Sequence, residues 1–582
     1  MAKFLIGLVA GALLAILIVV VVVFAGLRMR AAPPSIARGS TLVLALDGEI
    51  PERAPVEFPL PLWGAQNRPT VANVWMTLKM AAADERINAV LLAPRSIDAG
   101  WGKLEEIRAA LEQFRKSGKP LWAFLRSPGT REYYLATAAE RIYLAPEDPV
   151  MVKGLRAEMM YFRGTLDKLG VGVQIVHAGK YKDFGDMFTR ADMSPETREV
   201  TNSILDDLYG NLIQRIAQGR GKTPEEVRAL IDKGPFLSTE ARDAGLVDSL
   251  RFEDQVFGEL KTRLKADEIK KLALSRYMRV TPASLGLENS RHRIAYVVGQ
   301  GSITRGSPTD TGFGEQGITS EGFIKLLRRV AEDRNIQGVV VRIDSPGGEV
   351  TASDEIWREM NLLRQKKPMV ISFSDVAASG GYYIAMTGDP ILAYPGTYTG
   401  SIGVVFGKPT LRGLYNKLGI TKDMITRGRF GDIDTDYRPL GPEEIAKLQE
   451  GVAASYRDFV SKVSQSRRKP YEEIHEVAQG RVWLGAQAKP RGLVDELGGL
   501  DRAIELVKQK AKIPAADKVT LVPYPPRRSL LDVLMRRGAE EAIDTGLEAR
   551  LGPAARILKQ AESRLWMEGG LLRLMPYVLE VR

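Results

Sequence analysis

Short apolar runs rich in β-branched residues alternate along this chain with longer segments that have helical spacing. Residues 339–343 and 369–373 are two such runs, and residues 354–363 between them have the pattern of a helix. A strand, a helix and a second strand in this order predict a β-α-β unit, whose two parallel strands end at the same sheet edge. The pattern therefore predicts an α/β fold.

The chain is an internal duplication. Ile87 matches Ile336, Arg163-Gly164 matches Arg412-Gly413, and Leu169-Gly170 matches Leu418-Gly419, always 249 positions apart. A Gly-Leu-Val-Asp sequence near residue 245 recurs near residue 492. One constant offset over many positions indicates two copies of one fold. We predict repeats at residues 41–285 and 286–525.

Two glycine-containing turns follow the strand runs of the second repeat. Residues 344–348 read Asp-Ser-Pro-Gly-Gly, and residues 377–382 read Ala-Ala-Ser-Gly-Gly-Tyr. Ser379 lies where a helix is expected to begin, beside free glycine amides, and this environment suits a nucleophile whose intermediate is an oxyanion. For either turn alone, small residues that allow tight helix-to-strand packing are an equally good explanation.

The two copies have diverged in complementary places. The first copy has Thr130-Arg131 where the second has the Ser379 turn. It has residues 95–99 where the second has the glycine loop 344–348. Conversely, Lys182 of the first repeat corresponds to Gly431 of the second. A lysine kept in one copy and a serine in the other suggest one composite site between the repeats. Taken alone, Lys182 would be read as an ordinary surface lysine.

With these features the sequence resembles the signal peptide peptidase A family, bacterial membrane-anchored serine proteases of clan SK, in its long duplicated form. The resemblance rests on residues 344–348, 377–383, 399–403 and 179–182, and covers the chain after its amino terminus. It implies tandem ClpP/crotonase-like β-α-β repeats and a Ser/Lys dyad, with Ser379 as nucleophile and Lys182 as general base. It also implies an oxyanion hole formed by the amides of Gly348 and Gly380.

The chemistry of the residues agrees with that assignment. A serine hydroxyl needs a base, and the chain has only three histidines, of which His177 lies close to Lys182 in sequence. A Ser-His site using His177 therefore stays open as an alternative. Lysine serves as a base when burial lowers its pKa from about 10.4. Ser401, in a glycine-spaced turn, is expected either to support the lysine amine or simply to form the turn.

The two ends of the chain differ from the repeats. Residues 4–27, after a short flank at 1–3, carry no charge and are long enough to span a bilayer as a signal anchor, and residues 28–40 are a linker. Charge bias does not fix the orientation. The family resemblance implies the bacterial inner membrane, with the catalytic domain on the periplasmic side. Residues 526–582 mix basic and apolar positions and predict an amphipathic helical tail, which is expected to pack on the core in preference to joining protomers or lying on the membrane surface.

The composition of the chain limits which kinds of molecule it is expected to bind. The net charge is +11, but the 82 basic residues are spread over both repeats among 71 acidic ones, so a lipid surface is a simpler partner than nucleic acid. Absent cysteines, scattered histidines and the lack of a Walker loop predict neither metal nor cofactor. The resemblance implies remnant signal peptides, cut within their apolar cores, as substrates, and a ring-shaped homo-oligomer, a tetramer for the long form.

Two other functions fit the same pattern. A crotonase-like acyl-CoA enzyme also uses strand-turn-helix units and a glycine oxyanion hole, but needs no serine nucleophile. A non-catalytic membrane scaffold would result if both copies had lost activity. Close contact between the side chains of Ser379 and Lys182 would argue against the scaffold, whereas a wide separation would favour it.

Overall fold

The computed structural model describes residue 11 and residues 34–53, 68–289, 291–306, 317–525, 571–575 and 580–581. The transmembrane segment predicted at 4–27 lies outside these residues except for position 11, as does the first part of the predicted linker. Within the described residues, no helix is both long enough and apolar enough to cross a bilayer.

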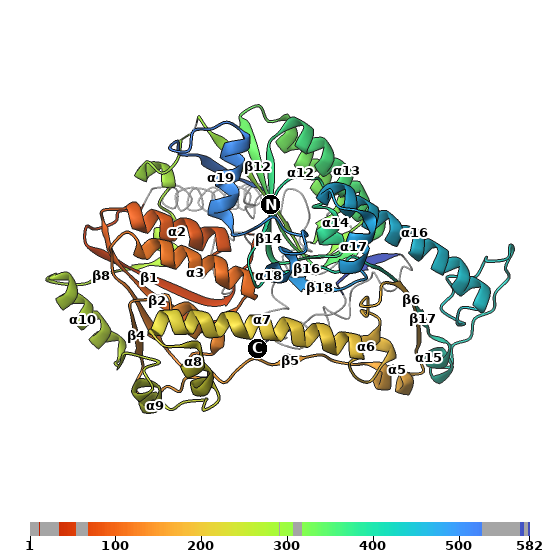
Figure 1. Ribbon diagram of the computed structural model, residues 1–582, viewed down its shortest axis with the longest axis horizontal. Coiled ribbons are helices and arrows are strands. Elements are labelled where there is room, and N and C mark those ends of the chain that lie inside the picture. The colour runs from red at the N-terminus through yellow and green to blue at the C-terminus, as the bar shows by residue number, and fades with distance from the viewer. Residues whose placement is uncertain are drawn as a thin grey trace, which may run out of the picture.

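Each repeat contains a parallel sheet with the same strand order (Figure 1). In the first repeat the order is β7-β4-β3-β2-β1-β8, and in the second it is β19-β15-β14-β12-β9-β20. The first set comprises β1 (Ser40–Glu49), β2 (Ile87–Asp98), β3 (Leu121–Leu125), β4 (Arg141–Leu144), β7 (Ser249–Leu250) and β8 (Lys270–Ala273). The second set comprises β9 (Arg293–Gln300), β12 (Ile336–Ser345), β14 (Met369–Ala378), β15 (Ile391–Ala393), β19 (Glu496–Leu497) and β20 (Thr520–Tyr524). The duplication seen in the sequence is therefore a duplication of the fold.

The second sheet has an extra branch that pairs with the end of β14, directly before Ser379. Strand β14 also pairs with β16 (Tyr398–Gly400), which pairs with β18 (Val482–Leu484). The apolar runs predicted as strands form the centres of β12 and β14, and the helix predicted between them is α13 (Val350–Lys366). Both strands extend beyond their apolar runs, which carries them into the two turns.

Helices cover both sheets and extend along their edges (Figure 1). Two helices of 26 residues, α7 (Pro195–Arg220) and α16 (Pro442–Arg467), follow equivalent points of the two repeats. Helix α7 crosses to the second repeat and contacts β18, whereas α16 packs on the long strands at the right of Figure 1. The other helices of the first repeat are α2 (Val71–Ala83), α3 (Trp101–Arg115), α4 (Thr130–Ala136), α5 (Arg163–Leu169), α6 (Asp186–Thr189), α8 (Pro224–Ile231), α9 (Ser238–Asp243), α10 (Glu253–Leu264), α11 (Leu274–Tyr277) and the 3-10 helix η1 (Pro282–Leu285). Those of the second repeat are α12 (Ser320–Glu332), α14 (Gly380–Tyr383), α15 (Arg412–Lys417), α17 (Tyr471–Val477), α18 (Gly485–Ala488) and α19 (Leu500–Lys510).

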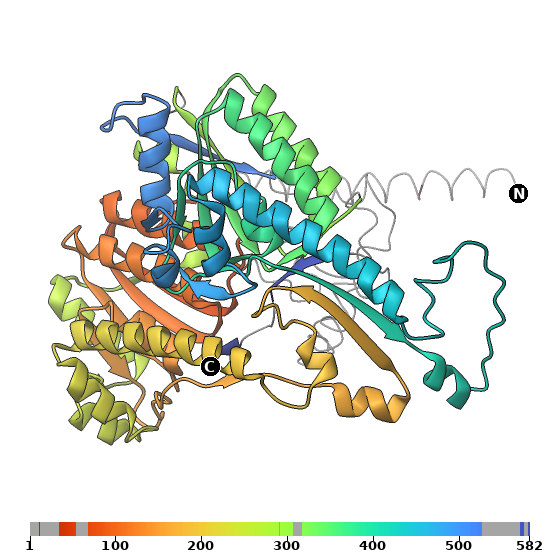
Figure 2. The same ribbon diagram turned by 45° about the vertical axis from the view of Figure 1, so that its right-hand side comes forward.

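A third sheet joins the repeats directly. Its strand order is β11-β10-β13-β21-β17-β6, with β11 (Ile318–Thr319), β10 (Ile303–Thr304), β13 (Gly347–Glu349), β21 (Leu572–Leu574), β17 (Val404–Thr410) and β6 (Gly172–Ala178). Strand β6 of the first repeat pairs antiparallel with β17 of the second along its whole length (Figure 2). A shared apolar core, containing for example Leu42 and Leu78 together with Val340 and Val370, continues across the repeat boundary. The two repeats therefore fold against each other.

The described part of the tail is extended and not helical. Residues 572–574 form β21 inside the third sheet, and β22 (Glu580–Val581) pairs with β5 (Ala157–Glu158). The amphipathic helix predicted for this stretch is therefore wrong where the structure describes it. The backbone of β21 finds hydrogen-bonding partners on two strand edges, and such tertiary pairing overrides a local helical pattern. The rest of the tail lies outside the described residues.

Candidate active site

Ser379 lies at a strained turn between β14 and α14. Its φ of 53° and ψ of −114° are unusual for a residue with a side chain, and its amide donates a 2.8 Å hydrogen bond to the carbonyl of Gly400. A methyl group on the following Gly381 would lie 2.5 Å from the Ser345 carbonyl oxygen, so only glycine fits where α14 starts against β12. The turn holds the serine in a fully buried position.

Lys182 reaches this serine from the first repeat. It follows β6, and its Nζ donates hydrogen bonds of 2.8 Å to the Ser379 hydroxyl and 2.8 Å to the Ser401 hydroxyl. A third bond of 2.9 Å goes to the Ser401 carbonyl oxygen. Since β6 pairs with β17, which begins three residues after Ser401, the antiparallel ladder between the repeats sets this register.

Two glycines make room for Lys182: Gly403, which lies in the 399–403 turn quoted for the family resemblance, and Gly480, which the sequence analysis did not single out. A methyl group on Gly480 would lie 2.5 Å from the Lys182 amide nitrogen, and one on Gly403 would lie 3.0 Å from its Cδ. Gly480 also has a φ of +81°, a value that side chains disfavour. No local pattern marks Gly480, because the segment that it accommodates comes from the other repeat.

Burial gives the lysine amine an unusual pKa. The side chain is fully buried, and desolvation lowers its pKa well below the ordinary value. Asp183 opposes this shift and Arg573 of the tail adds to it. Asp183 is itself mostly buried, and its pKa is raised to about 6. The surroundings thus favour an unprotonated amine. In that form its two N–H groups donate to the hydroxyl and the carbonyl of Ser401, and its lone pair accepts the proton of the Ser379 hydroxyl.

The glycines predicted for an oxyanion hole lie together beside Ser379. Gly348 is in β13 and Gly380 begins α14; a methyl group on Gly380 would lie 3.0 Å from the Gly348 amide nitrogen. Gly347, with a φ of +105°, turns the chain directly before Gly348. Backbone amides held this rigidly are suited to stabilise an oxyanion.

His177 lies apart from this cluster. Its ring is exposed, and its Nδ1 lies 3.1 Å from the Gly179 carbonyl oxygen. Lys182, and not His177, is the residue in contact with Ser379. The alternative of a Ser-His pair has no geometric support. Among the described residues, no group of three or more histidine and acidic side chains could hold a metal ion.

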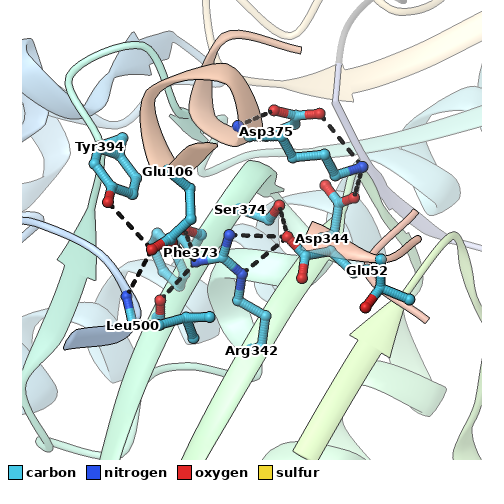
Figure 3. A network of polar contacts seen from close by, with 12 residues as sticks. Glu52, Glu106, Arg342, Asp344, Phe373, Ser374, Asp375, Tyr394 and Leu500 are labelled. Carbon is cyan, nitrogen blue, oxygen red and sulfur yellow. Dashed lines mark hydrogen bonds and ion pairs between the residues drawn. The ribbon is translucent and has the colours of Figure 1, made fainter. Parts of the chain in front are cut away.

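A buried ionic network supports the strands that lead into the site (Figure 3). Arg342 of β12 is fully buried and contacts Glu52 at 2.8 Å and Glu106 at 3.2 Å, both from the first repeat. Nearby, Lys103 at the start of α3 contacts Asp344 at 2.8 Å and Asp375 at 3.4 Å. The network joins the repeats at the carboxyl ends of β12 and β14, directly before the glycine and serine turns. The sequence analysis missed it, because these residues meet only in the folded protein.

Comparisons with known proteins agree with this architecture. The family model for peptidase family S49 matches residues 113–267 and again 361–514, and the Clp protease model matches residues 315–397. The chloroplastic serine protease SPPA of Arabidopsis thaliana is 38% identical over 87% of this chain and 74% of its own length. Protease 4 of Salmonella typhi is 31% identical over 84% of this chain and 80% of its own.

A solved structure of a ClpP1 mutant from Listeria monocytogenes overlaps 36% of this chain and 94% of its own, with 16% identity and a TM-score of 0.24. The family model and the relatives together cover both repeats. The chain therefore belongs to peptidase family S49, as a serine protease with two family repeats.

Proposed function

We propose that Ser379 and Lys182 form the catalytic dyad of this protease. The observation that carries the proposal is the 2.8 Å contact between the Ser379 hydroxyl and a fully buried lysine amine. In the proposed reaction Lys182 takes the hydroxyl proton as Ser379 attacks a peptide carbonyl, and the amides of Gly348 and Gly380 stabilise the oxyanion. The amine then protonates the leaving group, and water hydrolyses the acyl-enzyme. Ser401 holds the amine through its hydroxyl and carbonyl groups.

The proposed substrates are remnant signal peptides, presented to a membrane-anchored enzyme. Residues 4–27 would form the anchor, with the catalytic part on the periplasmic side of a bacterial inner membrane. This placement is supported by the uncharged run in the sequence and by the family resemblance.

We also propose that the protein is a homo-oligomer, a tetramer by its resemblance. Strand β6 pairs with β17 within the chain, but its counterpart in the second repeat, residues 421–427, is exposed and forms no strand. Ile425 in this segment is 87% exposed. A second copy, offering the first-repeat counterpart of β17, would repeat the pairing already made between the two halves.

The dyad is tested with purified full-length protein in detergent, acting on a leader-like peptide and a leucine ester. Ser379→Ala and Lys182→Ala should each abolish hydrolysis of both substrates, whereas Lys180→Ala, an exposed lysine two residues from the proposed base, should retain it. Circular dichroism confirms that each variant folds. Undiminished turnover by Ser379→Ala or Lys182→Ala would refute the dyad. Absence of turnover in the folded wild type would favour the scaffold or the acyl-CoA enzyme.

A further inference from the structure

The tail strand β21 occupies a slot between two edges of the active site. It pairs antiparallel with β13, which carries Gly348, and also with β17. The ladder with β13 continues on both sides: the Met575 amide donates to the Pro346 carbonyl at 2.8 Å, and the Val350 amide donates to the Leu571 carbonyl at 3.1 Å. An extended peptide bound in this slot would have main-chain partners on both of its edges.

The register places one residue of the tail at the reacting position. Arg573 lies opposite Gly348, the glycine assigned to the oxyanion hole. A methyl group on Gly347 would collide with the Arg573 carbonyl oxygen and would lie 2.6 Å from the Gly380 amide nitrogen. The carbonyl of Arg573 thus lies among the glycines that would hold the attacked carbonyl of a substrate. If the proposed oxyanion hole is correct, Arg573 occupies the position of the residue whose carbonyl is attacked.

The Arg573 side chain enters a closed aromatic and acidic site. It is 1% exposed, its guanidinium carbon lies 3.6 Å from the centre of the Tyr383 ring, and the Phe459 ring lies at 5.0 Å. Its Nη2 is 3.5 Å from a carboxylate oxygen of Asp458. Tyr383 lies at the end of α14, the short helix that begins directly after Ser379, so the segment that carries the serine also carries the ring in contact with Arg573. A cation over a desolvated aromatic ring is a favourable contact.

The charges around this site favour a cationic guest. Besides Asp458 it includes Asp354, whose carboxylate accepts a 2.5 Å hydrogen bond from the Tyr383 hydroxyl. The amine of Lys462 contacts Asp354 at 2.6 Å and Asp458 at 3.0 Å. Two carboxylates with one ammonium leave a net charge of −1, which the guanidinium of Arg573 balances. Asp354 and Asp458 are each about half exposed, so water screens part of this charge, and the guanidinium gains a moderate electrostatic attraction that an uncharged guest of the same length lacks.

The tail nevertheless fits its site incompletely. Within the part of the chain that the structure describes, the Nε and Nη1 atoms of Arg573 are buried without hydrogen-bond partners. Unsatisfied buried donors weaken the bound state, so the tail is held less tightly than a fully hydrogen-bonded guest would be. On the other face of β21, Leu572 and Leu574 pack with Val405 in an apolar cluster. The slot therefore receives a basic side chain on one face and apolar neighbours on the other.

We propose that this site, which the protein's own tail occupies in the structure, selects an arginine or lysine, flanked by apolar residues, at the position whose carbonyl is attacked. This inference rests on the proposed function and narrows its substrate class. The expectation from the family resemblance was cleavage within the apolar core alone.

The test uses full-length protein and three fluorogenic peptides that differ in one residue between two leucines: arginine, citrulline or leucine. Citrulline keeps the shape of arginine without its charge. We expect kcat/KM for the arginine peptide to exceed that for the citrulline peptide roughly tenfold or more, with cleavage after arginine by mass spectrometry. Asp458→Asn should reduce this ratio. Glu450→Gln, an exposed acid on the same helix α16, should leave the ratio unchanged. Equal rates for the three peptides, or a ratio insensitive to Asp458→Asn, would overturn the proposal.

Two further measurements separate this inference from the dyad. Binding of the same peptides to the inactive variant Ser379→Ala, measured by fluorescence anisotropy, tests the preference without hydrolysis. Equal affinities for the three peptides would contradict the basic site. Failure of the folded wild type to hydrolyse any peptide, with the arginine peptide still bound most tightly, would contradict the dyad and leave the site standing. Arg573→Ala should lower the apparent KM for the arginine peptide, because the tail competes less well. An unchanged KM would show that the tail does not occupy the slot in solution.

Discussion

Replacing Arg342 by methionine should destabilise the junction between the repeats more than any surface ion-pair change. Arg342 is fully buried and is the only cation in direct contact with Glu52 and Glu106 among the ion pairs of the described residues. It also donates hydrogen bonds of 2.8 Å to the Ser372 hydroxyl and 3.1 Å to the Phe373 carbonyl. The variant would leave two buried carboxylates and a strand carbonyl without this partner.

The magnitude follows from that geometry. Removing one member of a buried, hydrogen-bonded ion cluster typically costs about 3–5 kcal/mol, since the remaining charges stay desolvated. In the wild type, burial would raise the pKa of Glu52, but Arg342 and Lys103 together hold it below its usual value. Without Arg342 the pKa of Glu52 should rise above that of the unfolded chain, and the pKa of Glu106, which burial already raises, should rise further. The folded variant then binds more protons than the unfolded chain, so its loss of stability grows as the pH increases.

The assay is urea unfolding at pH 6 and pH 8, followed by tryptophan fluorescence and checked for reversibility. Arg429→Met is the matched control, because Arg429 pairs with Glu443 on the surface with both side chains about two-thirds exposed, and it should change stability by less than about 1 kcal/mol. Because the network lies before both turns, peptidase activity of Arg342→Met should fall as well. Stability close to that of the wild type at both pH values would refute this reasoning.

Three further predictions concern the lysine and its surroundings. Since the pKa of Lys182 is lowered, kcat/KM should rise with pH and reach its plateau at a pH well below the ordinary lysine pKa. For the same reason Lys182→Met should be more stable than the wild type at pH 7, by an amount that shrinks towards pH 10. A stability difference that does not change with pH would contradict the buried neutral amine. Burial raises the pKa of Glu105 from 4.5 to about 7, so wild-type stability should fall by about 3 kcal/mol from pH 4.5 to above 7; equal slopes for wild type and Glu105→Gln in urea titrations would exclude this. Gly480→Ala should displace Lys182 and reduce peptide hydrolysis about 100-fold with the fold retained, and full activity would show that the lysine segment tolerates the methyl group.

Much of the architecture could be predicted because duplication leaves a constant offset in the sequence. The apolar runs at 339–343 and 369–373 identify strands, since a buried parallel strand needs a continuous apolar segment. The first copy lacks the serine and the second lacks the lysine, which also indicates a site shared between the copies. The structure brings Ser379 and Lys182 within hydrogen-bonding distance. Neither argument requires knowledge of side-chain positions.

The tail could not be predicted in the same way. Residues 564–581 mix basic and apolar positions in a manner that suits an amphipathic helix, yet residues 572–574 form a strand. The deciding factor is the pair of open edges on β13 and β17, which come from other parts of the second repeat. A backbone that gains partners on both sides gives up its local preference.

The sequence alone therefore determines the repeated α/β units, the two turns and the residues able to carry nucleophilic chemistry, because these depend on local pattern and on comparison of the two copies. The low pKa of Lys182, the ionic cluster around Arg342 and the packing of Arg573 against Tyr383 are determined only by the tertiary structure. Each of these depends on desolvation and on distances between groups far apart in the chain, and both arise only when the repeats and the tail pack together.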